Sequence, residues 1–193
     1  MLSDKVWITR KCRINSEKRL KRDEHISQIL QLYYSSLLVL FSVYNLAYES
    51  SNTNLLLVMG SIIVLVSTVY LYSHNYNERA LIMRNCYIRL DEIYYKALRA
   101  EKKDEKDSVK QLLDEYTSIL MNIENHSEYD YLCVRYSLNN DPKATLPKFT
   151  KRDWISYYWA KIWRFLFLLI FATLPFIILL ARNTFTNVSF KTL

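Results

Sequence analysis

The sequence predicts an all-α membrane protein, in which a transmembrane helical hairpin continues into a long cytoplasmic helical hairpin and a third hydrophobic helix follows. Three observations predict this fold class. The 193 residues include one glycine and three prolines, fewer turn residues than sheets with tight turns usually need. Three long stretches contain no charged residue. The lysines and arginines, which give a formal net charge of +7, gather outside those stretches.

The first two uncharged stretches predict the transmembrane hairpin, over residues 26–77. Residues 26–48 form a run of 23 residues, long enough to cross roughly 30 Å of hydrocarbon. Residues 55–72 are the apolar centre of the second run, and the polar segment ESSNTN connects the two. A soluble helical hairpin is the alternative, but soluble helices carry a charged face and these carry none.

Residues 165–181 predict a third transmembrane helix. Their 17 residues are near the lower limit for a span, and Pro175 would kink the helix without forbidding it. Aromatic and basic side chains precede them, as at a membrane interface: Trp154, Tyr157, Tyr158, Trp159, Lys161, Trp163 and Arg164. A re-entrant or interfacial segment is the alternative.

The basic residues predict the orientation. Residues 1–25 hold eight lysines and arginines, whereas the loop at 49–54 holds none. By the positive-inside rule, the N-terminal segment and residues 78–164 are cytoplasmic. The hairpin loop and the tail at 182–193 are then external. No secretory signal peptide is expected, since residues 1–25 contain no apolar core.

The cytoplasmic portion is predicted to be helical. Residues 1–25 form a basic helix, and residues 78–125 form a hairpin whose arms meet near the charged run at 99–107. Two apolar stripes at helical spacing predict the arms: Ile82, Cys86, Leu90, Ile93 and Ala97 in the first, and Val109, Leu112, Leu113, Tyr116, Ile119, Leu120 and Ile123 in the second. The first arm is expected to continue the second span without a break. Residues 126–150 are expected to be less regular.

Enzymatic motifs are missing from the sequence. With the one glycine inside a predicted span, there is no phosphate-binding loop, dinucleotide fingerprint or nucleophile elbow. The three histidines lie far apart, and no two of the three cysteines have a CxxC spacing. We therefore expect no catalytic, cofactor-binding or metal-binding residues, and the sequence predicts a protein that is not an enzyme.

The first span carries a polar face, which we define as Gln28, Gln31, Ser35, Ser42, Asn45 and Glu49. These residues recur at helical spacing, with Leu38 among them, and the second span has a weaker pattern at seven-residue spacing. Two interpretations remain open: hydrogen-bonded packing between helices, or a water-lined path formed by several copies. On the second interpretation the candidate pore-lining residues are Gln31, Ser35, Ser42, Asn45, Ser61 and Thr68.

The basic segment before the first span has two interpretations as well. It sets the orientation and contacts anionic headgroups, or it binds a nucleic acid. Four acidic residues interrupt it, so direct nucleic-acid binding is not expected.

Two long segments resemble a known family. KVWITRKCRINSEKRLKRDEHISQ precedes the hairpin and YNERALIMRNCYIRLDEIYYKAL follows it. Their order resembles the SLATT family, SMODS- and SLOG-associating two-transmembrane effectors of bacteria, in the branch with an extra C-terminal hydrophobic helix. The positions that carry the resemblance are architectural or regulatory: Trp7, Arg13, Glu17, Arg19, Glu78, Arg79, Tyr87, Leu90 and Asp91.

The resemblance implies an antiviral defence effector. It would oligomerise in the bacterial inner membrane and form or open a pore, causing abortive infection when a partner sensor activates it. A neighbouring nucleotide-signalling enzyme or reverse transcriptase is the implied partner. The alternative is a membrane-anchored adaptor that recruits a cytoplasmic partner without conducting.

Overall fold

The computed structural model describes residues 1–47, 51–121, 123–141 and 146–189. The described residues form six helices and no strand, which confirms the all-α fold class. The chain divides into two compact units, Met1–Pro147 and Lys148–Leu193, each described by itself below.

Helix α1 spans Leu2–Ala47 and joins the basic segment to the first predicted span without a break. Its start is fixed by Glu101, whose carboxylate accepts hydrogen bonds from the backbone N–H groups of Leu2 and Ser3 and from the Ser3 hydroxyl. The first N–H groups of a helix have no hydrogen-bond acceptor within the helix, and here the Glu101 carboxylate serves as that acceptor. The beginning of α1 is thereby tied to the far end of α3.

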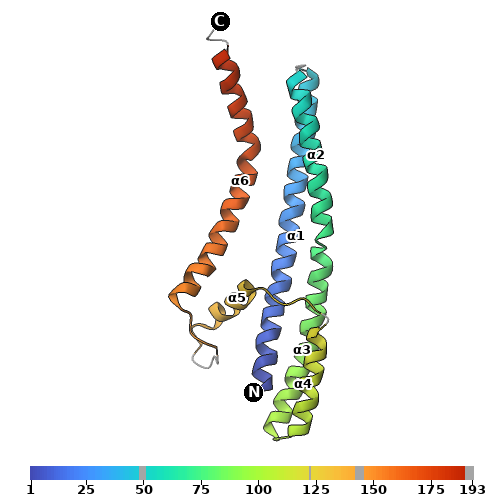
Figure 1. Ribbon diagram of the computed structural model, residues 1–193, viewed down its shortest axis with the longest axis vertical. Coiled ribbons are helices and arrows are strands. Elements are labelled where there is room, and N and C mark those ends of the chain that lie inside the picture. The colour runs from blue at the N-terminus through green and yellow to red at the C-terminus, as the bar shows by residue number, and fades with distance from the viewer. Residues whose placement is uncertain (48–50, 122, 142–145, 190–193) are drawn as a thin grey trace. The chain divides into compact units, whose positions relative to one another are not determined.

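Helices α2 (Ser51–Ser73) and α3 (Tyr76–Lys102) follow one another along α1 (Figure 1). The expectation of one unbroken helix here is wrong. Asn75 adopts the left-handed conformation, with φ 45° and ψ 43°, and separates the two helices. Asparagine reaches this conformation more easily than most residues because its short side chain hydrogen-bonds locally. The break follows directly after the apolar part of α2.

Helix α4 (Lys106–Met121) runs back along α3 and confirms the predicted helical hairpin. The buried face of α3 also packs against α1, which makes the N-terminal segment a third helix of the core. The core comprises Leu2, Val6, Cys86, Leu90, Ile93, Ala97 and Ile119. Two members of the predicted stripes, Ile82 and Leu113, are exposed.

A short helix that the sequence did not predict, α5 (Glu128–Leu138), packs against α1. It begins with a capping box, in which the Ser127 hydroxyl accepts from the Asp130 N–H and the Asp130 carboxylate accepts from the Ser127 N–H. The reciprocal pair satisfies two backbone donors at the helix start. The expectation of irregular structure is therefore wrong for this part of residues 126–150.

The second unit contains helix α6 (Lys151–Ser189), drawn in Figure 1 as one curved rod. Thr150 and Asp153 form a capping box at its start, with the Thr150 N–H donating to the Asp153 carboxylate at 2.9 Å. Trp159 and Trp163 stack with ring centroids 6.4 Å apart just before the predicted span. Pro175 lies inside the helix, which passes it without a break.

Candidate functional site

Within the part of the chain that the structure describes, three helical segments are long and apolar enough to cross a membrane. They lie within Leu2–Ala47, Thr53–Lys102 and Lys151–Ile177. The first two contain the predicted hairpin and the third contains most of the predicted C-terminal span. Length and composition thus mark the chain as a membrane protein.

Polar pairs join the two helices of the hairpin at both ends. The Gln31 amide donates to the Thr68 hydroxyl at 2.9 Å, and Thr68 itself donates to the Val64 carbonyl at 2.8 Å. Nearer the loop, the Asn45 amide donates to the Asn54 side-chain oxygen, and Asn45 is buried. The structure therefore brings three of the six candidate pore-lining residues into the contact between α1 and α2.

The middle of the hairpin is closely packed and apolar. A Cβ atom added to Gly60 would lie 3.0 Å from Cδ2 of Leu38, so any larger residue here would require the Leu38 side chain to shift. Ser35 is half-buried, whereas Ser42 and Ser61 are exposed, with the Ser61 hydroxyl donating to the Val58 carbonyl at 2.7 Å. The remaining three candidates are therefore not paired across the hairpin.

A cavity of about 600 Å³ opens between α1, α2 and the start of α3 at the Asn75 break, and we call it the junction cavity. The Gln31–Thr68 pair forms part of its wall. Its other polar lining includes Glu24, Gln28 and Glu78. The polar face of α1 thus ends at a cavity that polar and apolar side chains line together. Sequence reasoning missed the cavity because it depends on a break that no glycine or proline announces.

An ionic cluster around Asp130, a residue only 1% exposed, joins α5 to α1. Arg19 Nη2 donates to this carboxylate at 3.0 Å, the Ser16 hydroxyl at 2.8 Å and the Ser127 hydroxyl at 2.7 Å. Burial alone would raise the pKa of Asp130. The hydrogen bonds and the Arg19 charge outweigh burial, so the pKa lies below its usual value. We call these four residues the Asp130 cluster.

Two more arginines hold the segment between α4 and α5. The buried Arg13 guanidinium donates to the Glu124 carbonyl, and Arg79 pairs with the Glu124 carboxylate at 3.0 Å. His126 lies beside them, and burial followed by the Arg13 charge lowers its pKa. With the Asp130 cluster, these contacts fix this segment to α1 and α3.

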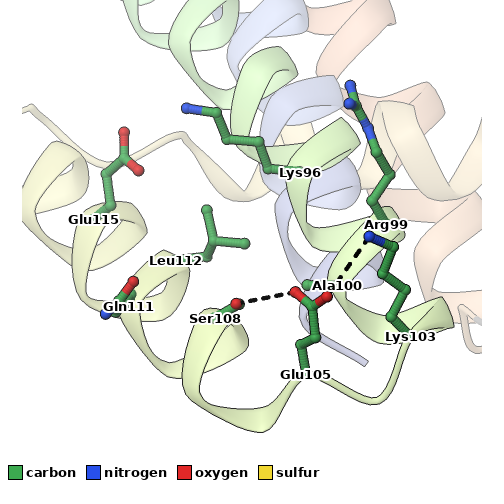
Figure 2. A pocket seen from close by; sticks show the side chains of 9 residues that line it. All are labelled: Lys96, Arg99, Ala100, Lys103, Glu105, Ser108, Gln111, Leu112 and Glu115. Carbon is green, nitrogen blue, oxygen red and sulfur yellow. Dashed lines mark hydrogen bonds and ion pairs between the residues drawn. The ribbon is translucent and has the colours of Figure 1, made fainter.

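A second, smaller hollow of about 330 Å³ lies at the tip of the α3–α4 hairpin (Figure 2). Its walls mix basic and acidic side chains, with Lys103 3.7 Å from Glu105 and Ser108 3.1 Å from the same carboxylate. The alternating charges favour no single class of ion. Within the described residues, no group of His, Cys, Asp and Glu side chains is arranged to hold a metal.

The sequence of this chain matches one protein family over residues 1–181, a range that includes the hairpin, the cytoplasmic helices and most of α6. The family is described as SMODS and SLOG-associating 2TM effector domain family 5. No curated protein and no solved structure matches the chain. The predicted SLATT family is confirmed, and the chain belongs to SMODS and SLOG-associating 2TM effector domain family 5.

Proposed function

We propose that this chain assembles into a homo-oligomer in the bacterial inner membrane and forms or opens a pore there. A partner sensor, such as a neighbouring nucleotide-signalling enzyme or reverse transcriptase, would activate it, and the open pore would arrest growth or kill an infected cell. The family description as an effector domain associated with SMODS and SLOG supports the place of the chain in such a system.

The observation that carries the proposal is the line of polar groups along the hairpin. It runs from Asn45 and Asn54 at the loop, through Ser42 and Ser35, to Gln31, Thr68 and the junction cavity. Polar side chains inside a membrane are costly and usually mark an ion or substrate path. One hairpin cannot enclose water, so several copies would have to arrange their hairpins around a common axis.

The second candidate function is a membrane-anchored adaptor. It is favoured by the Gln31–Thr68 and Asn45–Asn54 hydrogen bonds, which satisfy these side chains within one hairpin as plain helix packing would. On this alternative the spans only tether the chain, and the cytoplasmic core of α1, α3 and α4 recruits a partner. Neither candidate includes a catalytic step.

Replacing polar residues with leucine distinguishes the two candidates. In a pore, Gln31→Leu with Ser42→Leu should dry the path by hydrophobic gating, so the double variant should assemble normally without depolarising the cell. Ser36→Leu is the matched control, since Ser36 is exposed and lies off the polar face. For each variant, the membrane potential of the cells is compared with the amount of oligomer recovered from them.

The adaptor predicts a different relation between the two readouts. Lost interhelical hydrogen bonds typically cost about 0.6–2 kcal/mol in a membrane, so any loss of toxicity should follow loss of assembly. An intact oligomer that no longer depolarises supports the pore. Full depolarisation by an intact oligomer of the double variant removes Gln31 and Ser42 from the mechanism.

A further inference from the structure

We propose that the junction cavity is the cytoplasmic mouth of the pore and that it concentrates cations, so that the open pore conducts cations in preference to anions. This inference rests on the proposed pore function and adds the class of ion that the pore passes.

The junction cavity is large enough for a water-filled entrance, and polar side chains form part of its mixed lining. Its volume of about 600 Å³ corresponds to roughly 20 water molecules at about 30 Å³ each, so a cation can enter with its hydration shell. Hydroxyl and amide groups of Ser27, Gln28 and Gln31 supply partners for that water. The Gln31–Thr68 pair in its wall belongs to the polar line along the hairpin.

The charged groups in the lining are all acidic. Glu24 and Glu78 line the junction cavity, and no lysine or arginine does. Glu24 accepts a hydrogen bond only from the neutral Gln28 amide, at 3.3 Å, and the exposed Glu78 carboxylate has no ion-pair or hydrogen-bond partner in the described part of the chain. Both negative charges therefore remain uncompensated at the mouth.

The basic side chains nearby do not cancel these charges, although the cytoplasmic portion as a whole is basic. The three nearest in sequence each face an acidic partner: Lys21 with Glu17 at 2.6 Å, Arg22 with Asp23 at 3.5 Å, and Arg79 with Glu124 at 3.0 Å. The net charge at the cavity is thus negative, although the surrounding protein surface is basic.

Uncompensated carboxylates in a cavity act strongly on ions. A cleft lined by one sign of charge focuses the electric field and raises the local concentration of counter-ions. Rings of Asp or Glu side chains select cations in channels on this principle. In a symmetric oligomer each copy would add its own Glu24 and Glu78, so the pair would be repeated around the path.

The test measures the reversal potential of the purified full-length protein in planar bilayers of zwitterionic lipid under a KCl gradient. Protein is taken from cells whose growth it has arrested, so that the active form is sampled. The wild type should reverse near the potassium equilibrium potential. The E24Q/E78Q variant should conduct with a reversal potential near zero. The control D114N/E115Q removes two exposed acidic charges on α4 and should behave as wild type.

Two results would overturn the inference while leaving the pore in place: wild-type currents without cation preference, or unchanged preference in E24Q/E78Q. Absence of any wild-type current would instead overturn the proposed pore itself, and the inference with it. Glu78 is exposed and has no partner among the described residues, so E78K should fold and assemble even if the double variant does not. E78K should shift the reversal potential toward the chloride equilibrium potential. A wild-type reversal potential in E78K would also contradict the inference.

Discussion

Asp130 is a buried carboxylate that ties α5 to α1. Its carboxylate is 1% exposed and is held by Arg19, Ser16 and Ser127. Asp130→Ala leaves the Arg19 charge without its partner in a largely buried place, and breaking a buried pair in this way typically costs about 3–5 kcal/mol. We expect the full-length protein in detergent to unfold at lower denaturant and to be cleaved faster between α4 and α5. Asp114→Ala, at an exposed site on α4, should change neither readout.

Acid should loosen the same segment, because two groups there have lowered pKa values. The lowered pKa of His126 means that the folded state favours the neutral imidazole. The contribution of His126 to the free energy of unfolding is therefore complete above its unfolded pKa near 6.5 and declines as the pH falls toward the lower folded pKa. Asp130 follows at lower pH, below its unfolded value near 3.8. Proteolysis between α4 and α5 should therefore speed up on acidification from neutral pH to below pH 6.5.

His126→Gln isolates the histidine part of this effect. The variant should lose the pH dependence that begins near 6.5 and keep the part that begins near 3.8. His25→Gln, at an exposed site on α1, is the control and should retain the wild-type profile. If the His126 variant titrates like the wild type, the histidine has no part in the acid response.

At the scale of the helices, regular periodicity made the α3–α4 hairpin predictable, since Leu90, Ile93 and Ile119 recur on apolar stripes. The packing of α1 into the same core was not predictable in this way. Its buried positions combine Leu2, Val6 and Leu20 with small or polar residues such as Cys12 and Ser16, and eight basic residues surround them. The charged residues around these positions therefore obscured the periodic pattern that would have predicted a buried face on α1.

The other differences from the sequence prediction have local causes. Ser127 and Asp130 have the spacing of a capping box, so a sequence signal for α5 existed. The Asn75 break had no such signal, because no glycine or proline marks it. For the candidate site, the polar face of α1 was visible in the sequence, but its pairing was not. Which side chain meets Gln31 depends on the register between α1 and α2, which the sequence does not reveal.

The α2–α3 break offers a test at the same scale. Asn75→Ala forces a residue without a polar side chain into the left-handed region, at a cost of about 1–2 kcal/mol, so the variant should favour one straight helix. Spin labels at the exposed positions Ser67 and Arg84 should then move toward about 26 Å, the length of 17 helical residues. Asn75→Gly should keep the wild-type distance, because glycine accepts this conformation. Equal distances in both variants would show that the break does not depend on Asn75.

At the scale of the whole molecule, we predict the orientation in the membrane from where the basic residues lie. A cysteine placed at Asn52, near the start of α2, should react with an impermeant reagent added outside intact cells. A cysteine at Lys103, at the tip of the α3–α4 hairpin, should react only after the cells are opened. External labelling at Lys103 would invert the proposed topology. A probe at Lys191, which lies outside the described residues, tests whether the third span crosses.

The central claim is that the chain acts by making the membrane permeable to ions. The most direct measurement follows membrane potential and viability together in single cells after controlled expression of the wild-type protein with its activating partner. We predict that the membrane depolarises before viability falls, because ion flow through the pore causes the arrest. Growth arrest in cells that keep their full membrane potential would contradict the pore and leave the adaptor as the account of this protein.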